Sequence, residues 1–183
     1  FNWLNPKIVE HIKLESKKFN KIDYEETIHL TEIKEMIEKA TTPQEKAIII
    51  TMFESGCRAS ELLDLNVHDL NIDENGSSIR VDGKTGKRKM GLILSSPYLQ
   101  EHMNNHVNKG EPTTPLFFST SHIHYGGRLS HSGLRYLLAR AVKRIGLKNR
   151  CNPHWFRHSG LTFVYSQGFN EAEMRIWAGW SDD

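Results

Sequence analysis

The chain has 183 residues, which is enough for one domain with an arm or for two small domains. Hydrophobic residues make up 38% of it and charged residues 25%, so the composition predicts a packed core and excludes a largely disordered chain. No apolar run is long enough to span a membrane and no secretion signal is recognisable. Cys57 and Cys151 are therefore expected to be reduced thiols in a cytosolic protein.

Positive charge is concentrated in one stretch of the chain. Residues 76–168 contain 14 Lys or Arg against three acidic residues, a balance of +11, whereas the other residues contain 10 against 19, a balance of −9. The net charge of the whole chain is only +2. This asymmetry indicates a polyanion as the partner of the basic stretch, with nucleic acid as the first candidate. The alternative is a basic face that is simply solvated.

The chain begins with a polar, lysine-rich segment. We interpret residues 1–28 as a linker or arm, with a short helix near residues 7–17, that follows a missing upstream domain. From Leu30 to Ala40 apolar residues recur at helical spacing, which predicts the first helix of the folded part.

A helix-start pattern comes next. Thr42 suits the N-cap, Pro43 the first helical position, and Glu45 would complete a capping box. The apolar run at 47–53 that follows predicts a buried central helix, and Gly56 is expected to end it.

Two short segments, 77–81 and 90–94, predict a β-hairpin. Residues 82–89 between them read as a glycine-containing turn that carries four cations. A lysine in a turn is usually only solvated, but Lys84 stands at the end of a strand, where the backbone is better fixed, so we assign it a positioned role. The other three cations are expected to contact DNA: Lys87, Arg88 and Lys89.

Further helices are expected at 97–107, 131–145, 153–167 and 170–178, with a short buried segment at 116–118. The helix at 131–145 has an apolar face and a basic face, so it could lie along a DNA groove or form a basic surface helix. The basic side chains of this region that we expect to contact DNA are Arg128, Arg135, Arg140, Lys143 and Arg144.

Ten histidines make a zinc site a hypothesis to weigh. His102 and His106 are one helical turn apart, and His122 and His124 form a close pair. No Cys or carboxylate stands at a spacing that would complete a site. We therefore expect no metal and no other cofactor.

His154 and Arg157 can present two hydrogen-bonding groups on one face of a helix, because residues at i and i+3 share a face. The planar fork of an arginine suits phosphate oxygens, and a histidine can donate or move a proton near neutral pH. Arg58 follows a glycine turn beside apolar helices, where a charge needs a partner. It is either one half of a weak surface pair with Glu61 or an arginine that Glu61 aims at a phosphate.

Four segments, in this order and spacing, resemble the catalytic domain of the tyrosine recombinases, the phage-integrase and Xer-like family: Gly56–Leu62, Gly83–Lys84, Pro153–His158 and Ala178–Trp180. The resemblance covers about residues 28–183. It is consistent with a place among the archaeal and viral members of the family. It implies an α+β, mostly helical catalytic-domain fold with a small antiparallel sheet over residues 29–183.

The resemblance also implies roles for single residues. Arg58 and Arg157, here called the clamp, would hold the non-bridging oxygens of a scissile phosphate. Lys84 would protonate the leaving 5′ oxygen, and His154 would hydrogen-bond the phosphate and assist proton transfer. Trp180 would contact the phosphate through its indole N–H, unless it is a core aromatic residue.

Two further residues are implied to support this group: Glu61 would orient Arg58, and His158 would have a structural role. The expected partner is double-stranded DNA, bound by a homo-oligomer, a tetramer on two sites, with no membrane involved.

The nucleophile is the one departure from the family pattern. The family's tyrosine follows the position of Trp180 by about nine residues, beyond Asp183. Tyr165 comes one helix too early, and Tyr125 and Tyr136 fit no better. We therefore expect a chain that holds the clamp without its attacking tyrosine, which a removed C-terminal tail or a neighbouring protomer would supply.

Three other functions stay open at this point. A degenerate, non-catalytic relative would bind DNA in a salt-sensitive way without forming a covalent adduct. A metal-dependent nuclease would use the histidine cluster. A type IB topoisomerase would share the recombinase chemistry and the clamp residues.

Overall fold

Helix α3 (Pro43–Ser55) lies in the middle of the fold because nearly all its residues are buried, with an apolar run from Ala47 to Ile50 followed by Met52 and Phe53. The Thr42 hydroxyl accepts a hydrogen bond from the Glu45 N–H (3.1 Å), Pro43 takes the first helical position, and Gly56 ends the helix with φ 58°. These predictions are confirmed, with one difference. The Glu45 carboxylate accepts from Thr41 instead of completing the box at Thr42.

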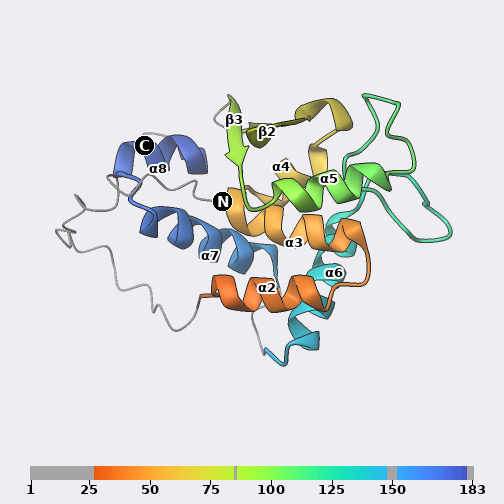
Figure 1. Ribbon diagram of the computed structural model, residues 1–183, viewed down its shortest axis with the longest axis horizontal. Helices are drawn as coiled ribbons and strands as arrows, with labels where there is room; N and C mark the ends of the chain where they lie inside the picture. The colour runs from red at the N-terminus through yellow and green to blue at the C-terminus, as the bar shows by residue number, and fades with distance from the viewer. Residues whose placement is uncertain (1–26, 85, 148–151, 181–183) are drawn as a thin grey trace.

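The computed structural model describes residues 27–84, 86–147 and 152–180. The expected arm at 1–28 falls mostly outside these residues, but Ile28 is buried and its N–H donates to the Ser159 hydroxyl at 2.8 Å, so position 28 is part of the fold. Figure 1 shows α3 between its neighbours. The helices around it are α2 (Leu30–Glu38), α4 (Ala59–Asp64), α5 (Ser96–Asn104), α6 (His131–Arg144), α7 (Pro153–Ser166) and α8 (Glu171–Ala178).

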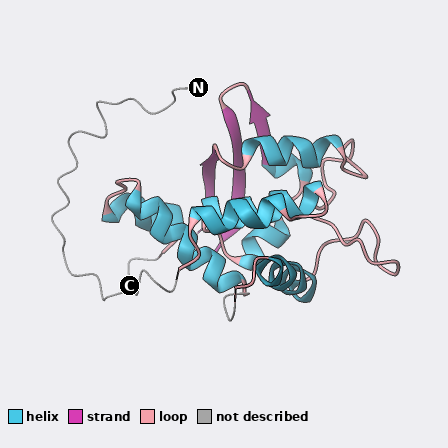
Figure 2. Cartoon of the chain, turned by 60° about the horizontal axis from the view of Figure 1, so that its bottom comes forward, coloured by secondary structure: helices cyan, strands magenta, loops and turns pink. Residues whose placement is uncertain are grey.

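One antiparallel sheet in the order β1-β2-β3 completes the fold, and Figure 2 shows its strands gathered beside the helices. The strands are β1 (Leu70–Asp73), β2 (Gly76–Gly83) and β3 (Gly86–Leu92). A short 3-10 turn, η2 (Val67–Asp69), precedes β1. The expected mostly helical α+β fold with a small antiparallel sheet is confirmed, although α4 and β1 were not predicted.

The hairpin turn is much shorter than the sequence predicts. Pairing continues to Gly83 opposite Gly86, so residues 87–89 belong to β3 and not to a loop. Successive residues of a strand face opposite sides of the sheet. Lys87 and Lys89 are exposed on the outer side, whereas Arg88 turns to the inner side with Met90, which is buried. This alternation separates three cations that the sequence had placed together.

Helices α3 and α7 approach each other closely at Gly160. A Cβ at this position would overlap the carbonyl oxygen of Phe53, so only glycine allows the two backbones to come this near. The crossing brings the end of α3, with Gly56, beside the first turns of α7, which carry His154 and Arg157.

The connection from α5 to α6 is a long loop tied down by backbone hydrogen bonds (Figure 1, right). Gln44 exchanges two hydrogen bonds with the Phe118 backbone. His102 and His106 also anchor this loop. His102 Nε2 hydrogen-bonds the Leu116 carbonyl at 2.8 Å, and His106 Nε2 hydrogen-bonds the Pro115 carbonyl at 3.1 Å. No cluster of three or more metal-ligating side chains occurs among the described residues.

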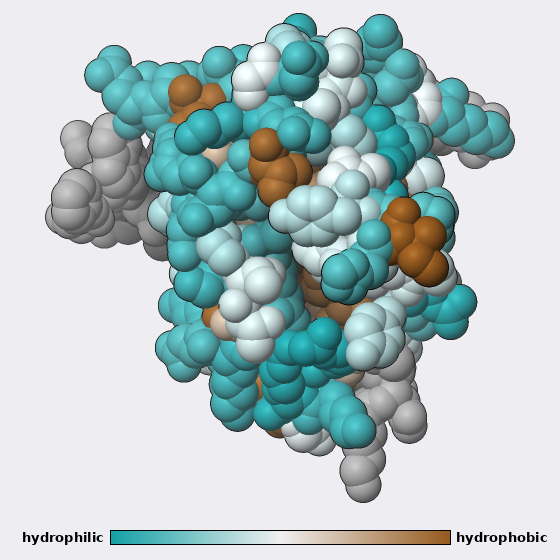
Figure 3. All heavy atoms as spheres, turned by 90° about the vertical axis from the view of Figure 1, so that its right-hand side faces the viewer, coloured by the Kyte–Doolittle hydropathy of each residue, from teal (hydrophilic) through white to brown (hydrophobic). Residues whose placement is uncertain are grey.

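The face of the molecule that contains this loop is mostly hydrophilic, with hydrophobic side chains scattered singly (Figure 3). Single exposed apolar residues are normal on a protein surface. Within residues 27–84, 86–147 and 152–180, no helix is both long enough and apolar enough to cross a bilayer.

Candidate active site

Arg58 owes its place to the turn that ends α3. Gly56 adopts the left-handed conformation there, and Arg58 becomes the residue before the first turn of α4. Its Nη1 donates to Glu61 Oε1 at 3.0 Å, and its Nη2 donates to the carbonyl oxygen of Gly179 at 3.0 Å. The side chain remains 35% exposed, so it reaches solvent from a fixed position.

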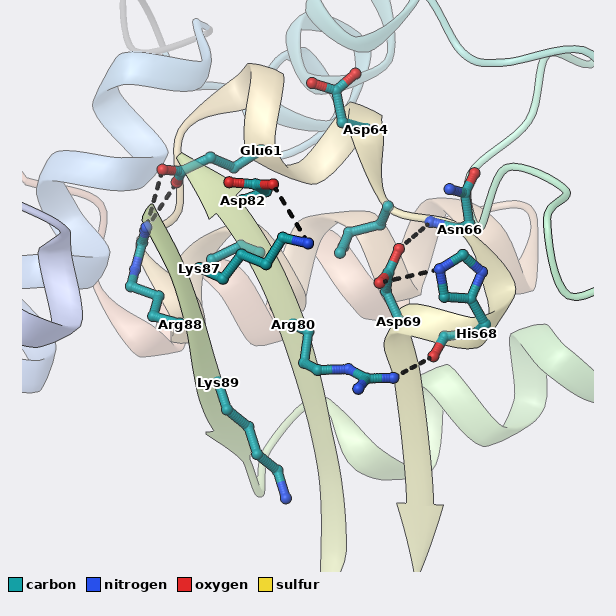
Figure 4. Close-up of a pocket in the computed structure, with 12 residues that line it drawn as sticks. Glu61, Asp64, Asn66, His68, Asp69, Arg80, Asp82, Lys87, Arg88 and Lys89 are labelled. Atoms are coloured by element: carbon teal, nitrogen blue, oxygen red, sulfur yellow. Dashed lines mark hydrogen bonds and ion pairs between the residues drawn. The ribbon is translucent and has the colours of Figure 1, made fainter. Parts of the chain in front are cut away.

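Glu61 is a buried carboxylate that holds two arginines, and Figure 4 shows its contact with one of them, Arg88. It accepts from the Arg58 N–H at 2.7 Å and from both terminal nitrogens of Arg88 at 3.0 and 2.8 Å. Burial alone would raise the pKa of Glu61, but the hydrogen bonds from Arg88 and from the Arg58 N–H outweigh it and lower the pKa. Since Glu61 is only 2% exposed, its ion pair with Arg58 is not the weak surface pair that the sequence left open.

Arg157 approaches from the opposite side, on α7. Its Nη1 donates to the carbonyl of Gly56 at 2.6 Å, and its Nη2 to the carbonyl of Ala178 at 2.8 Å. Burial lowers the pKa of Arg157, and the positive charge of Arg58 lowers it further. Two guanidinium groups from distant parts of the chain therefore meet in a place that favours a bound anion.

The C-terminal end of α8 lies against these arginines. The carbonyl groups of Trp177, Ala178 and Gly179 accept hydrogen bonds from Arg88, Arg157 and Arg58, respectively. The last carbonyls of a helix have no partner within the helix and carry partial negative charge, so cations stabilise them. The indole N–H of Trp177 also donates to the Ser55 carbonyl at 2.8 Å, which fastens α8 to the end of α3.

The remaining expected site residues surround this group. Lys84 is exposed in the hairpin turn, directly after Gly83, whose Cα lies against the Glu61 carboxylate. His154 is exposed in the first turn of α7. Trp180 is 43% exposed and lines a cleft of about 420 Å³ between the hairpin and α8. Its exposure argues against a core aromatic residue.

The phage integrase family model matches residues 25–183. The chain belongs to the phage integrase family. Members similar to it include the tyrosine recombinase XerC of Pelotomaculum thermopropionicum, 29% identical over 153 residues, and that of Roseiflexus castenholzii, 30% identical over 149 residues. These alignments cover 75% and 76% of this chain but only 47% and 45% of the relatives. The chain thus spans about half the length of the curated relatives it matches.

Solved structures with the same fold include the XerA recombinase and XerH bound to its difH substrate in a pre-cleavage complex. Their TM-scores are 0.72 and 0.70 at 21% and 19% sequence identity. The match covers 84% of this chain and 53% of XerA, and 85% of this chain and 47% of XerH. The chain therefore shares its fold with these two recombinases at low sequence identity.

The cations expected to contact DNA divide into two groups in this family member. Three are engaged within the protein: Arg88 with Glu61, Arg128 with backbone carbonyls of Leu63 and Leu65, and Arg144 with Glu45. Arg88 is only 10% exposed, which corrects its expected place on the surface. The exposed ones are Lys87, Lys89, Arg135, Arg140 and Lys143.

Two residues adjoin Arg58 and Arg157 in the chain: His158 is half-buried and Cys57 is fully buried. Burial lowers the pKa of His158, and the neighbouring His154 lowers it further, which suits the expected structural role of a neutral ring. Cys57 is fully buried next to Arg58, and burial raises the pKa of its thiol to about 11. Cys151 lies outside the described residues. The thiol of Cys57 therefore stays protonated near neutral pH.

Sequence reasoning missed the inward side chain of Arg88 and the anchoring indole of Trp177. A signal for Arg88 was present in the sequence. If the strand predicted from residue 90 begins four residues earlier, Arg88 falls on the same face of the sheet as Met90 and Leu92, which are buried. The helical spacing of α8 predicts that Trp177 is half-buried. It cannot reveal the hydrogen bond from the indole to the Ser55 carbonyl, because Ser55 is 122 residues away in the chain.

Proposed function

We propose that the chain is the catalytic domain of a site-specific DNA recombinase, which activates a scissile phosphate for attack by a tyrosine. The observation that carries this proposal is the meeting of Arg58 and Arg157 on adjacent carbonyls at the end of α8. Two forks of positive charge, held by backbone and carboxylate, suit the two non-bridging oxygens of a phosphodiester. Membership of the phage integrase family supports the same reading.

The reaction exchanges one ester for another. The tyrosine oxygen forms a bond to phosphorus while the bond from phosphorus to the 5′ oxygen breaks, which leaves a 3′-phosphotyrosyl link and a 5′-hydroxyl. The clamp stabilises the charge that develops on the non-bridging oxygens. Lys84 gives its proton to the departing 5′ oxygen. His154 hydrogen-bonds the phosphate and assists transfer of the proton that the tyrosine hydroxyl loses as it attacks. The reverse sequence rejoins the strands, and no metal or nucleotide takes part.

Double-stranded DNA is the proposed partner, with a homo-tetramer of the whole protein on two sites. The exposed cations Lys87, Lys89, Arg135, Arg140 and Lys143 would hold the phosphate backbone. Trp180, at the rim of the cleft beside α8, would contact the scissile phosphate through its indole N–H.

The direct test is to trap the covalent adduct. The protein encoded by the complete gene is incubated with sheared genomic DNA from its own source, the reaction is stopped with detergent, and DNA attached to protein is sequenced. We expect adducts at a discrete site, formed equally well with EDTA present. Salt-sensitive DNA binding without adducts would instead identify a non-catalytic relative, and cleavage abolished by EDTA a metal-dependent nuclease. Relaxation of supercoils without strand exchange between duplexes would identify a topoisomerase.

A further inference from the structure

We infer that Arg88 is a positioning residue of the active site, which holds Glu61 and the end of α8 in the arrangement that the clamp requires. The inference rests on the proposed function for its catalytic consequence. Arg88 belongs to β3 and was expected to contact DNA from the surface, whereas the inference gives it a structural role inside the candidate active site.

The first support is the pairing of Arg88 with Glu61. Both terminal nitrogens of Arg88 bind the carboxylate, at 3.0 and 2.8 Å, in a two-point contact that a lysine cannot reproduce. The same carboxylate holds Arg58 through its backbone N–H and its guanidinium. Without Arg88, Glu61 would keep only its bonds to Arg58, and its hold on the direction of the Arg58 guanidinium would weaken.

The second support is the bond from Arg88 Nε to the carbonyl of Trp177 at 3.0 Å. This bond ties the β-hairpin to the end of α8, next to the carbonyls that bind Arg157 and Arg58. Arg88 lines both the cleft beside α8, with Trp180, and the cleft of about 550 Å³ beside α4 (Figure 4). Lys87 lines both clefts as well, but it is exposed, whereas Arg88 is held by Glu61 and Trp177.

The third support comes from Gly83, on the neighbouring strand. A Cβ at this position would overlap Glu61 Oε1 and lie 3.2 Å from Arg88 Nη1. The hairpin backbone thus packs directly on the ion pair, one residue before Lys84. The pair sets the distance between the lysine and the clamp as well as the direction of Arg58.

Two substitutions test this role independently. Arg88→Lys keeps the charge but removes the fork, and Gly83→Ala displaces Glu61 without changing any charge. The matched controls are Arg80→Lys, an exposed arginine of β2 that donates only to the His68 carbonyl, and Gly91→Ala, where an added Cβ meets nothing within 4 Å. Thermal unfolding of each variant shows which of them remain folded.

The first readout is adduct formation by the complete protein on a duplex that carries the mapped site. At saturating DNA we expect Arg88→Lys and Gly83→Ala to slow it by about tenfold or more, the effect of one charge-assisted hydrogen bond. DNA affinity should stay within about twofold, because the cations that hold the backbone are unchanged. Rates within about twofold of the controls would overturn the inference.

The second readout does not depend on cleavage. The Glu61 carboxylate is followed by NMR as pH falls, and its signal is assigned with Glu61→Gln. In Arg88→Lys its titration should move to higher pH, and in Arg80→Lys it should stay unchanged. An unmoved titration in Arg88→Lys would overturn the positioning role. If the parent protein forms no adduct at all, the proposed function fails, and this titration still decides the role of Arg88.

Discussion

Gly160 of α7 lies directly against the carbonyl oxygen of Phe53 in α3. This contact sets how near the two helices come, and both halves of the clamp depend on it. Arg157 precedes Gly160 by one turn, and Arg58 follows the end of α3. The bond from Arg157 to the Gly56 carbonyl exists because the crossing is this close.

Gly160→Ala should therefore destabilise the domain. Its methyl group would overlap backbone atoms that cannot rotate away, and overpacking of this kind costs about 1–3 kcal/mol. Urea unfolding measures the loss, with Gly110→Ala as the control, because an added Cβ there meets nothing within 4 Å. Equal midpoints for the two variants would show that the helices can separate at no cost.

Arg157→Ala in the complete protein should abolish most strand cleavage and spare most DNA affinity. Removing one donor to a developing oxyanion typically costs about 100- to 1,000-fold in rate, whereas several other exposed cations remain to hold the DNA backbone. Single-turnover adduct formation and fluorescence anisotropy measure the two quantities, with Arg80→Ala as the control. A cleavage rate equal to that of the parent would remove Arg157 from the clamp.

Lys84→Ala should be rescued by a better leaving group. If Lys84 protonates the 5′ oxygen, a substrate with sulfur at the 5′ bridging position needs no such proton, because a thiolate leaves readily. Cleavage of the oxygen and sulfur substrates is compared in Lys84→Ala and in Lys87→Ala. Lys87 is 83% exposed on the outer face of β3, so we expect no selective rescue there. Rescue of Lys87→Ala alone would show that the wrong lysine was assigned.

The exposed basic face of α6 should contribute to the salt dependence of DNA binding. Each phosphate contact contributes about 0.9 to the slope of log affinity against log salt concentration. Replacing Arg135, Arg140 and Lys143 together by alanine should therefore lower the slope by about 3. The matched control is Lys34→Ala, Lys39→Ala and Lys46→Ala combined, on α2 and α3. An unchanged slope in the α6 variant would identify this face as merely solvated.

His102 should make the fold less stable in mild acid. Burial lowers the pKa of His102 from 6.5 to about 4. Between pH 6.5 and pH 4 the imidazole is therefore protonated in the unfolded chain but stays neutral in the folded chain. The contribution of the neutral ring is complete above pH 6.5 and is lost as pH falls toward 4, by about 3 kcal/mol in total. Unfolding free energies measured across this range should fall less steeply in His102→Gln. Parallel curves for parent and variant would contradict a neutral, buried His102.

The long helices could be predicted because each carries its own local signals. Thr42 and Pro43 mark the start of α3, Asn152 caps α7, and Gly179 ends α8 in the left-handed conformation. Elements as short as β1 and α4 show too little of a pattern, since four strand residues cover only two periods and six helical residues fewer than two. The basic turn at 82–89 was misread for a different reason. Cations suggest a solvated loop, whereas pairing with β2 extends the strand through them.

The candidate site could be predicted only as a set of residue types. Arg58, Lys84, His154 and Arg157 stand out through motifs. The backbone carbonyls that hold the guanidinium groups of Arg58 and Arg157 carry no sequence signal. Arg88 and Trp177 bind carbonyls 89 and 122 residues away in the chain. Contacts of this kind follow from tertiary packing, and no local pattern encodes them.

If the chain has the proposed function, the carbonyl oxygens at the end of α8 have a consequence for the speed of the chemistry. They fix the planes of Arg58 and Arg157 before any DNA arrives, while the remaining N–H groups of both guanidiniums stay outside these bonds. A phosphate that enters meets donors already oriented, so little reorganisation energy is left to the reaction step. Each guanidinium group therefore has one anchor at the end of α8 and a second one elsewhere, which is Glu61 for Arg58 and the Gly56 carbonyl for Arg157.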